Sequence, residues 1–262
     1  MKLMGRRLGR RGRAMMASMI IAGAVASSVM ASASAADATV MTDRCGNGMV
    51  LLAVRGTGEA PGVGGTAAVV RSYFNGDKDI PTWSQGIDYP AVAMTLNDTY
   101  YNSLRKGQLG LKGVLENIAS TCKNASVGIV GYSQGAEVVG DVLQAGGLST
   151  KAKNSIRAVA LFGDPTYVPG EPWDAAGNGT KPGAFTARGK GAFKAWSRQT
   201  WPIGASAPVS KSIVKSWCFK GDMFCQDNLL GGSAAATVHA SYGKKVGYEA
   251  YAWIRSWMIS QS

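Results

Sequence analysis

The sequence predicts an α/β fold, in which a central, mostly parallel sheet of about five strands carries helices on both faces. Three observations predict it. Short apolar runs alternate along the chain with stretches of helical periodicity, which is the pattern of parallel strands joined by helical crossovers. The runs are apolar throughout, as expected for strands buried on both faces. Two of them end in glycine-rich turns, where the chain can bend sharply at the edge of a sheet.

The predicted strands follow one another along the chain. Residues 49–54 form a continuous apolar run that stops in the glycine-rich stretch 55–62, which indicates a buried strand entering a loop. Two further apolar runs, 127–130 and 156–162, predict buried strands of the same kind. Residues 212–217 are predicted to be the last strand.

Three helices are predicted around these strands. Apolar residues at helical spacing predict one over residues 104–122 and another over 136–144. A closing helix is predicted over residues 248–260, with these side chains packed inward: Trp253, Ile254, Trp257 and Met258. Residues 166–211 lack periodicity and are rich in Gly, Pro and Ser. We expect them to form a long surface excursion within one domain, with a short helix around residues 193–201.

The composition excludes several classes of protein. The 262 residues are 46% hydrophobic and 17% charged, with 35 Gly, 9 Pro and 4 Cys, so the chain is not disordered, collagen-like or a disulfide-stapled miniprotein. The formal net charge is +12, but six of the 28 basic residues precede residue 14. These six are Lys2, Arg6, Arg7, Arg10, Arg11 and Arg13.

The first 36 residues are predicted to be a secretory signal peptide. After the basic start, residues 14–30 are apolar or small, and two overlapping Ala-x-Ala frames follow at residues 31–35. We place the cleavage near Ala35 or Ala36. The protein is therefore expected to be secreted and extracellular.

An N-terminal membrane anchor is the alternative for this segment. Gly23 and the serines Ser18, Ser27 and Ser28 interrupt the run, and no later run approaches 18 apolar residues. We therefore favour cleavage and expect residues 37–262 to form a single domain. Two Arg-Arg pairs leave the export route open.

Export makes disulfides the favoured role of the four cysteines. None of them forms a Cys-x-x-Cys pair, and three pairings are possible. The short separation of Cys218 and Cys225 favours the pairing Cys45–Cys122 with Cys218–Cys225. Because the chain has one histidine, a His-rich metal site is excluded, and we expect no metal.

The main chemical signal is the string Gly131-Tyr132-Ser133-Gln134-Gly135, a G-x-S-x-G nucleophile elbow. It joins a predicted strand to a predicted helix, and its glycines allow a strained turn that lifts the serine hydroxyl above the carboxyl edge of the sheet. The alternative is a glycine-rich turn with an idle serine. The strand-to-helix context favours a nucleophile.

A serine hydroxyl needs a base to remove its proton during attack. In this chain that base can only be His239, which lies after Ser133 and near the end, in the order nucleophile, acid, base. The alternative for His239 is a structural role. Pattern alone leaves two candidates for the orienting acid, Asp164 at the end of a strand and Asp222 between two cysteines.

Five segments that follow one another between residues 53 and 243 carry a family resemblance. They are Ala53–Glu59, Gly131–Gly135, Phe162–Pro165, Cys218–Cys225 and His239–Gly243. Together they make the chain resemble the cutinase family of serine esterases, including the actinobacterial cutinase-like proteins. The resemblance spans nearly the whole predicted mature chain, and it implies a three-layer α/β-hydrolase-type fold.

The resemblance also implies residue roles. Ser133 would be the nucleophile, His239 the base and Asp222, in preference to Asp164, the acid. The backbone N–H groups of Thr57 and Gln134 would form the oxyanion hole, with the Thr57 hydroxyl as an extra donor. No cofactor is implied, and the favoured cysteine pairing matches that of the family.

Two departures from the family limit the transfer of roles. Thr57 stands where fungal cutinases have serine, which leaves the backbone donor intact and the side-chain role open. The stretch 165–217 is longer than in the compact fungal members, so the rim of the active site can differ.

We therefore predict a secreted serine esterase that hydrolyses carboxylic ester bonds through an acyl-enzyme. Its substrate would be a cutin-type polyester or short-to-medium acyl esters. The alternatives are a lipase or phospholipase and an acetylxylan-type esterase, which would keep the same triad, and a non-catalytic secreted binding protein. We expect a monomer.

The charge pattern suggests one further partner. Between Asp174 and Asp222 there is no acidic residue but there are eight basic ones: Lys181, Arg188, Lys190, Lys194, Arg198, Lys211, Lys215 and Lys220. One hypothesis is an anionic surface approached by electrostatic steering, and the favoured alternative is a solvated basic loop.

Nucleic acid is not expected as a partner, because no recognised binding module accompanies the charge. Pro61 breaks the G-x-G-x-x-G pattern that starts at Gly56, which argues against a nucleotide cofactor.

Overall fold

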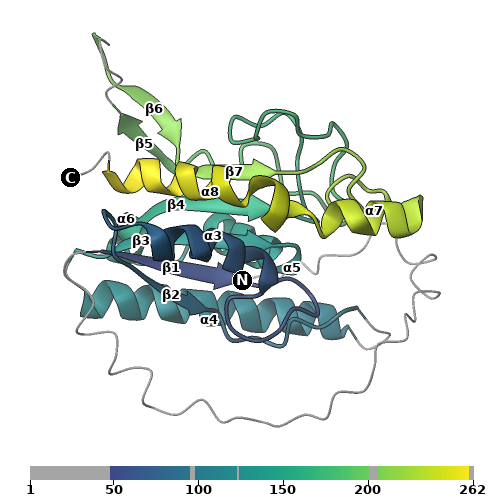
Figure 1. The fold of residues 1–262 in the computed structure, drawn as a ribbon, viewed down its shortest axis with the longest axis horizontal. Coiled ribbons are helices and arrows are strands. Elements are labelled where there is room, and N and C mark those ends of the chain that lie inside the picture. Colours follow the sequence, from purple (N-terminus) through teal and green to yellow (C-terminus); the bar gives the residue numbers. More distant parts are fainter. Residues whose placement is uncertain (1–47, 95–97, 123, 201–205, 260–262) are drawn as a thin grey trace.

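The computed structural model describes residues 48–94, 98–122, 124–200 and 206–259. Within these ranges, five strands form a parallel sheet in the order β2-β1-β3-β4-β7 (Figure 1). The strands are β1 (Met49–Val54), β2 (Thr82–Gly86), β3 (Ser126–Tyr132), β4 (Ile156–Phe162) and β7 (Val214–Trp217). Every neighbouring pair is parallel. The predicted α/β fold, with its sheet of about five parallel strands, is confirmed.

Helices cover both faces of the sheet (Figure 1). Helices α3 (Gly65–Gly76) and α8 (Tyr242–Ile259) pack together on one face, and α4 (Thr99–Thr121) and α5 (Gln134–Ala145) pack together on the other. The short helix α6 (Thr150–Ser155) leads into β4. A 3₁₀ turn (Leu229–Gly231) and helix α7 (Gly232–His239) lie beyond the carboxyl ends of the strands (Figure 1). Active sites of parallel sheets lie at this edge.

Burial explains which elements the pattern revealed. Strand β1 is buried along its whole length, and β4 is buried except for Arg157, so both read as unbroken apolar runs. Strand β2 lies at the edge of the sheet and is only half-buried, and its sequence Thr-Trp-Ser-Gln-Gly carries no apolar run. Helix α3 begins in the glycine-rich loop, where no helical start signal stands out. Neither β2 nor α3 was predicted.

The predicted helix bounds were too narrow at their amino ends. Helix α4 begins at Thr99 rather than at residue 104, and α8 begins at Tyr242 rather than at residue 248. The closing helix does pack inward as predicted. Ile254 and Trp257 are buried in the core, and Trp253 and Met258 pack against it.

The prediction for residues 166–211 was wrong in two respects. No helix forms at residues 193–200, because β5 (Ser197–Thr200) pairs there with β6 (Val209–Ser212) in an antiparallel hairpin that stands out from the molecule (Figure 1). The segment is also not a surface excursion. Trp173, Phe193 and Trp196 belong to the main hydrophobic core, so isolated aromatic side chains anchor an irregular chain without any periodicity to reveal them.

The described disulfide agrees with the predicted pairing. Cys218 and Cys225 are bonded to each other. Cys122 is also disulfide-bonded, and its predicted partner Cys45 lies outside the described residues, as does the predicted signal peptide. No helix in the described ranges has both the length and the apolar character that a membrane span requires.

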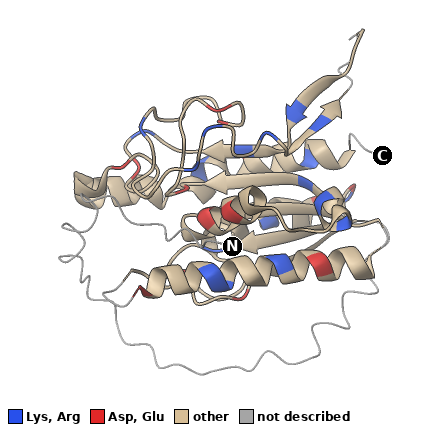
Figure 2. Cartoon of the chain, turned by 180° about the vertical axis from the view of Figure 1, so that it is seen from behind, with Lys and Arg blue, Asp and Glu red and all other residues tan. Residues whose placement is uncertain are grey.

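The basic residues are not gathered into one loop. Figure 2 shows basic and acidic segments interspersed over the helices, with further basic residues on both strands of the β5–β6 hairpin. Arg188 is buried and ion-paired, and the ammonium groups of Lys211 and Lys215 lie over tryptophan rings. The prediction of a solvated basic loop is therefore wrong for Arg188. The side chains of Lys211 and Lys215 also contact other parts of the molecule.

Candidate active site

The sharp strand-to-helix turn of the G-x-S-x-G motif forms as the sequence predicts. Strand β3 ends at Tyr132 and helix α5 begins at Gln134, so Ser133 occupies the turn between them with φ 54° and ψ −121°. Its backbone N–H donates to the carbonyl of Phe162 on the neighbouring strand at 2.9 Å. A Cβ atom on Gly135 would lie 1.9 Å from the Val54 carbonyl oxygen. The motif therefore needs glycine at that position because strand β1 passes too close for any side chain.

The structure brings Ser133, His239 and Asp222 together. His239 is the last residue of α7, and its Nε2 lies 2.8 Å from Ser133 Oγ. Its Nδ1 lies 2.9 Å from Asp222 Oδ2 and 3.0 Å from Asp222 Oδ1. Ser133 and His239 are each 7% exposed, and Asp222 is fully buried. The serine can therefore lose its proton to the ring while the carboxylate fixes the opposite ring nitrogen.

Asp222 is held as a buried carboxylate by several donors. The backbone N–H groups of Phe224 and Cys225 donate to Oδ1 at 2.7 and 2.9 Å, and the Tyr242 hydroxyl donates to Oδ2 at 2.8 Å. Burial alone would raise the pKa of Asp222, but the hydrogen bonds and the neighbouring His239 hold it below its usual value. The acid is thus charged at neutral pH.

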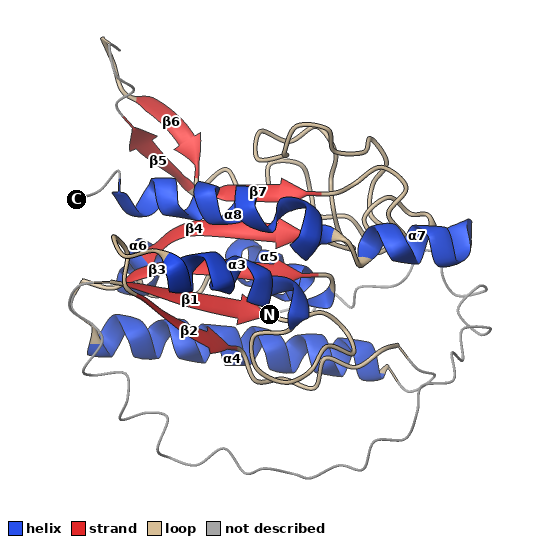
Figure 3. Ribbon diagram, in the orientation of Figure 1, coloured by secondary structure: helices blue, strands red, loops and turns tan. Residues whose placement is uncertain are grey.

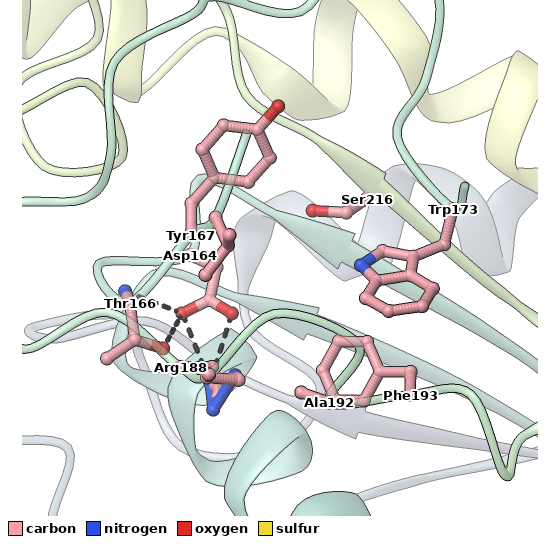
Figure 4. A pocket seen from close by; sticks show the side chains of 10 residues that line it. Asp164, Thr166, Tyr167, Trp173, Arg188, Ala192, Phe193 and Ser216 are labelled. Carbon is pink, nitrogen blue, oxygen red and sulfur yellow. Dashed lines mark hydrogen bonds and ion pairs between the residues drawn. The ribbon is translucent and has the colours of Figure 1, made fainter. Parts of the chain in front are cut away.

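The other candidate acid, Asp164, belongs to a separate cluster (Figure 4). Its carboxylate accepts hydrogen bonds from the backbone N–H and the hydroxyl of Thr166 at 2.9 and 2.7 Å. It also forms an ion pair with Arg188, whose Nη2 lies 3.0 Å from Oδ2. Asp222, and not Asp164, therefore contacts the histidine.

Arg188 connects this cluster to α5, the helix that follows Ser133. Its Nη1 lies 2.7 Å from Asp141 Oδ1, and its Nη2 donates to the backbone carbonyl of Glu137 at 3.2 Å. A Cβ atom on Gly140 would lie 2.3 Å from the guanidinium carbon, so the helix leaves room for this side chain. Arg188 thus anchors the irregular segment to α5.

Glu137 is a buried acid that sequence reasoning missed. It lies on the first turn of α5, it is 1% exposed, and its Oε2 accepts a hydrogen bond from the Tyr100 hydroxyl at 2.7 Å. Burial, and then the negative charge of Asp141, raise its pKa to about 8. A carboxylate close to the apolar face of the predicted helix 136–144 is the signal that could have found it.

The residues expected to form the oxyanion hole flank the serine. Gln134 is fully buried at the amino end of α5, where helix N–H groups lack partners within the helix. Thr57 is exposed in the loop after β1. A Cβ atom on the preceding Gly56 would lie 3.2 Å from Ser133 Cβ, so this loop runs directly beside Ser133.

Glu59 fixes the shape of the Thr57 loop. Its carboxylate accepts hydrogen bonds from the backbone N–H groups of Gly56 at 2.7 Å and Thr66 at 2.8 Å. Arg55 adds to the support by donating from Nη1 to the carbonyl of Ile87 at 3.2 Å. Sequence reasoning did not assign a role to either charged residue.

A groove of about 460 Å³ opens beside the serine and histidine. Its wall combines polar and apolar groups, among them Thr57, Glu59, Val69, Tyr132, Ala240 and Lys244. Tyr132 and Ala240 directly adjoin Ser133 and His239 in the sequence, so the groove lies next to both residues. In the described ranges, no group of three or more His, Cys, Asp or Glu residues is placed to hold a metal ion.

The chain is similar to known proteins over most of its length. A model of the cutinase family matches residues 44–258. Acetylxylan esterase 2 of Talaromyces purpureogenus is 28% identical over 233 residues, which cover 83% of this chain and 89% of that protein. Cutinase 11 of Verticillium dahliae is 27% identical over 217 residues, which cover 77% of this chain and 66% of that protein.

A solved structure shows the same architecture. The catalytic core domain of acetyl xylan esterase from Trichoderma reesei superposes with a TM-score of 0.63 at 27% sequence identity. The match covers 82% of this chain and 100% of that domain.

Proposed function

Because the chain belongs to the cutinase family, it is a carboxylic ester hydrolase, and we propose that Ser133, His239 and Asp222 are its catalytic triad. One observation carries the proposal: His239 Nε2 lies 2.8 Å from Ser133 Oγ while its Nδ1 contacts the buried carboxylate of Asp222. That arrangement lets a serine hydroxyl act as a nucleophile at neutral pH.

The proposed reaction passes through a covalent acyl-enzyme. Ser133 Oγ attacks the ester carbonyl carbon while His239 Nε2 accepts the hydroxyl proton. His239 then donates that proton to the departing alcohol as the carbon–oxygen bond breaks. A water molecule, activated by the same ring, attacks the acyl-enzyme and releases the acid and free Ser133. Asp222 remains ionised and stabilises the positive charge that the ring carries in between.

The negative charge on the carbonyl oxygen needs its own donors. We assign this role to the backbone N–H groups of Thr57 and Gln134, with the Thr57 hydroxyl as an additional donor. The positive end of helix α5 supports Gln134, and Glu59 supports the loop of Thr57 through Gly56. Rigid donors of this kind stabilise the transition state without reorganisation.

We propose cutin-type polyesters or short-to-medium acyl esters as the substrates. The groove beside the triad has polar and apolar walls, which suits an ester of mixed polarity. A second candidate is an acetylated polysaccharide, because the acetylxylan esterase of T. purpureogenus aligns with 83% of this chain. Both candidates use the same proposed triad.

Three further expectations belong to this proposal. Residues 1–36 would be removed on secretion, leaving 37–262 as one domain, and the mature enzyme would act as a monomer. An anionic surface remains a proposed partner only through the exposed members of the basic stretch, because Arg188 is buried among carboxylates.

Hydrolysis of p-nitrophenyl esters from two to sixteen carbons would test the activity, with acetylated xylan and a polyester film assayed in parallel. We expect Ser133→Ala to abolish turnover of every substrate while the fold is kept. Ser72→Ala, on the exposed side of α3, is the matched control and should keep full activity. Film erosion would identify a polyester hydrolase, and acetate release from xylan without erosion would favour the second candidate. Substantial turnover by purified Ser133→Ala would refute the assignment.

A further inference from the structure

We propose that Tyr242 is a positioning residue for the esterase reaction. Its hydroxyl donates a hydrogen bond to Asp222 and so holds the carboxylate, and through it the ring of His239, in the orientation that the reaction needs. This inference rests on the proposed function, because Tyr242 acts through the roles proposed for Asp222 and His239. Tyr242 is the first residue of α8, three positions after His239, and it is fully buried.

The neighbours of the Tyr242 hydroxyl determine where its proton points. The oxygen lies 2.9 Å from the backbone nitrogen of Phe219, which can only donate, and 2.8 Å from Asp222 Oδ2, which can only accept. The Cys225 sulfur, at 3.3 Å, is part of a disulfide and a weak acceptor beside a charged carboxylate. The tyrosine therefore accepts from Phe219 and donates to Asp222.

Packing prevents the tyrosine ring from leaving this position. The ring stacks on Phe219 with 4.4 Å between centroids and an angle of 4°, and it lies parallel to Phe162 at 5.9 Å. These contacts come from the disulfide loop and from β4. Tyr242 thus joins the loop that carries Asp222 to the helix that begins just after His239.

The charge states of Tyr242 and Asp222 keep the proton of this hydrogen bond on the tyrosine. Burial, and then the negative charge of Asp222, raise the pKa of Tyr242 well above its ordinary value, so the hydroxyl stays protonated. Other titratable groups lie nearby: the Tyr132 hydroxyl donates to the His239 carbonyl, Glu59 and Lys244 line the groove, and the Lys245 ammonium lies over the Phe219 ring. None of these changes in the test below.

Removing the hydroxyl should alter catalysis in a specific way. Without the Tyr242 donor, the Asp222 carboxylate attracts the Nδ1 proton of His239 more strongly and is also free to turn. The protonated ring becomes more stable, so the acidic limb of the pH profile of kcat/KM should move to higher pH. We expect the loss of this hydrogen bond to a charged group to lower kcat about tenfold to a hundredfold. KM should stay within about twofold, because the Tyr242 hydroxyl does not touch the substrate.

The experiment compares Tyr242→Phe with Tyr251→Phe. Tyr251 lies on the same helix and its hydroxyl donates to Asp77 Oδ2 at 2.9 Å, so the control removes the same kind of bond at a distance from the triad. We expect Tyr251→Phe to keep the wild-type kcat and pH profile. A wild-type kcat and pH profile in folded Tyr242→Phe would overturn the inference.

Two further measurements keep the test decisive. In an Asp222→Ala background, where the acceptor is gone, adding Tyr242→Phe should cause no further loss of kcat, and a full additional loss would contradict action through Asp222.

If Tyr242→Phe does not fold, 3-fluorotyrosine at position 242 keeps the shape and strengthens the donor. It should move the acidic limb to lower pH, and an unchanged limb would count against the inference. Wild-type activity of Asp222→Ala alone would instead refute the proposed triad.

Discussion

At the scale of single residues, the site depends on positions where the available space or the backbone conformation restricts which residue can stand there. Gly135 lies against strand β1, where a Cβ atom would fall 1.9 Å from a carbonyl oxygen. Ser133 adopts a positive φ that non-glycine residues rarely take. Strain of this kind persists only where the surrounding structure enforces it, and here β1, β4 and α5 all do so. The serine is therefore presented to His239 at 2.8 Å before any substrate arrives.

Glu137 predicts a pH dependence of stability. Its folded-state pKa is about 8, above the ordinary value of 4.5, so the native state binds more protons than the unfolded state between these values. The contribution of Glu137 is therefore fully present below about pH 4.5 and is lost as the pH rises toward 8. Each pH unit in this window lowers the free energy of unfolding by up to about 1.4 kcal/mol.

Glu137→Gln should remove this dependence, because the amide cannot ionise and can still accept from Tyr100. Urea denaturation between pH 5 and 9 measures it. We expect the variant to gain stability over the wild type as the pH rises, and to be the more stable protein at pH 9. Parallel curves for the two proteins would show that Glu137 is ionised throughout.

At the scale of elements, the irregular segment between β4 and β7 is linked to the strand and the helix on either side of the site. Arg188 forms ion pairs with Asp164 at the end of β4 and with Asp141 on α5. The guanidinium and both carboxylates are largely removed from water, with the Arg188 side chain 3% exposed. A buried pair of this kind contributes little net stability, but breaking it leaves charges unpaired.

Arg188→Met should therefore lower the free energy of unfolding by about 3–5 kcal/mol, as chemical denaturation would show. The matched control is Arg255→Met. Arg255 also bridges two aspartates, but its own side chain is 27% exposed and that of Asp79 is 74% exposed. The buried Asp77 keeps the hydrogen bonds from the Tyr251 hydroxyl and the Asp79 backbone N–H, so the effect should be much smaller. Equal losses in the two variants would contradict the role given to burial.

At the scale of the whole molecule, one hydrophobic core unites the sheet, its helices and the irregular segment. Trp196 is 5% exposed, packs in the main core and donates from Nε1 to the carbonyl of Leu143 on α5 at 2.9 Å. We therefore expect the segment that carries it to unfold with the rest of the molecule. In the part of the chain that the structure describes, the β5–β6 hairpin projects from this body (Figure 1).

Trp196→Ala tests this integration. If the segment is part of the core, the substitution should lower the free energy of unfolding by about 3–5 kcal/mol, in a single cooperative transition followed by calorimetry. Leu109→Ala, at an apolar side chain that is 65% exposed, should change it by no more than about 0.5 kcal/mol. A small effect at Trp196, or a separate early transition, would mean that the segment lies outside the core.

The sequence predicted the centre of this molecule better than its rim. Buried parallel strands such as β1 and β4 read directly as apolar runs, and the elbow at Ser133 stood between such a strand and a helix. The sequence pattern did not predict the edge strand β2, because a half-exposed strand carries no apolar run. It did not predict the packing of the segment around Arg188, because a loop held by scattered single side chains has no periodicity. The choice between Asp164 and Asp222 needed the family resemblance, since pattern alone shows neither the Arg188 partner of the first nor the His239 contact of the second.

The most direct test of the central claim is labelling with a fluorophosphonate probe, followed by peptide mapping and intact-mass analysis. If Ser133 is the nucleophile activated by His239 and Asp222, one probe should attach per molecule, on Ser133, and esterase activity should fall in proportion to labelling. Ser133→Ala should remain unlabelled, and His239→Ala should label far more slowly. Loss of activity with the probe on another residue, or full activity after Ser133 is labelled, would contradict the account.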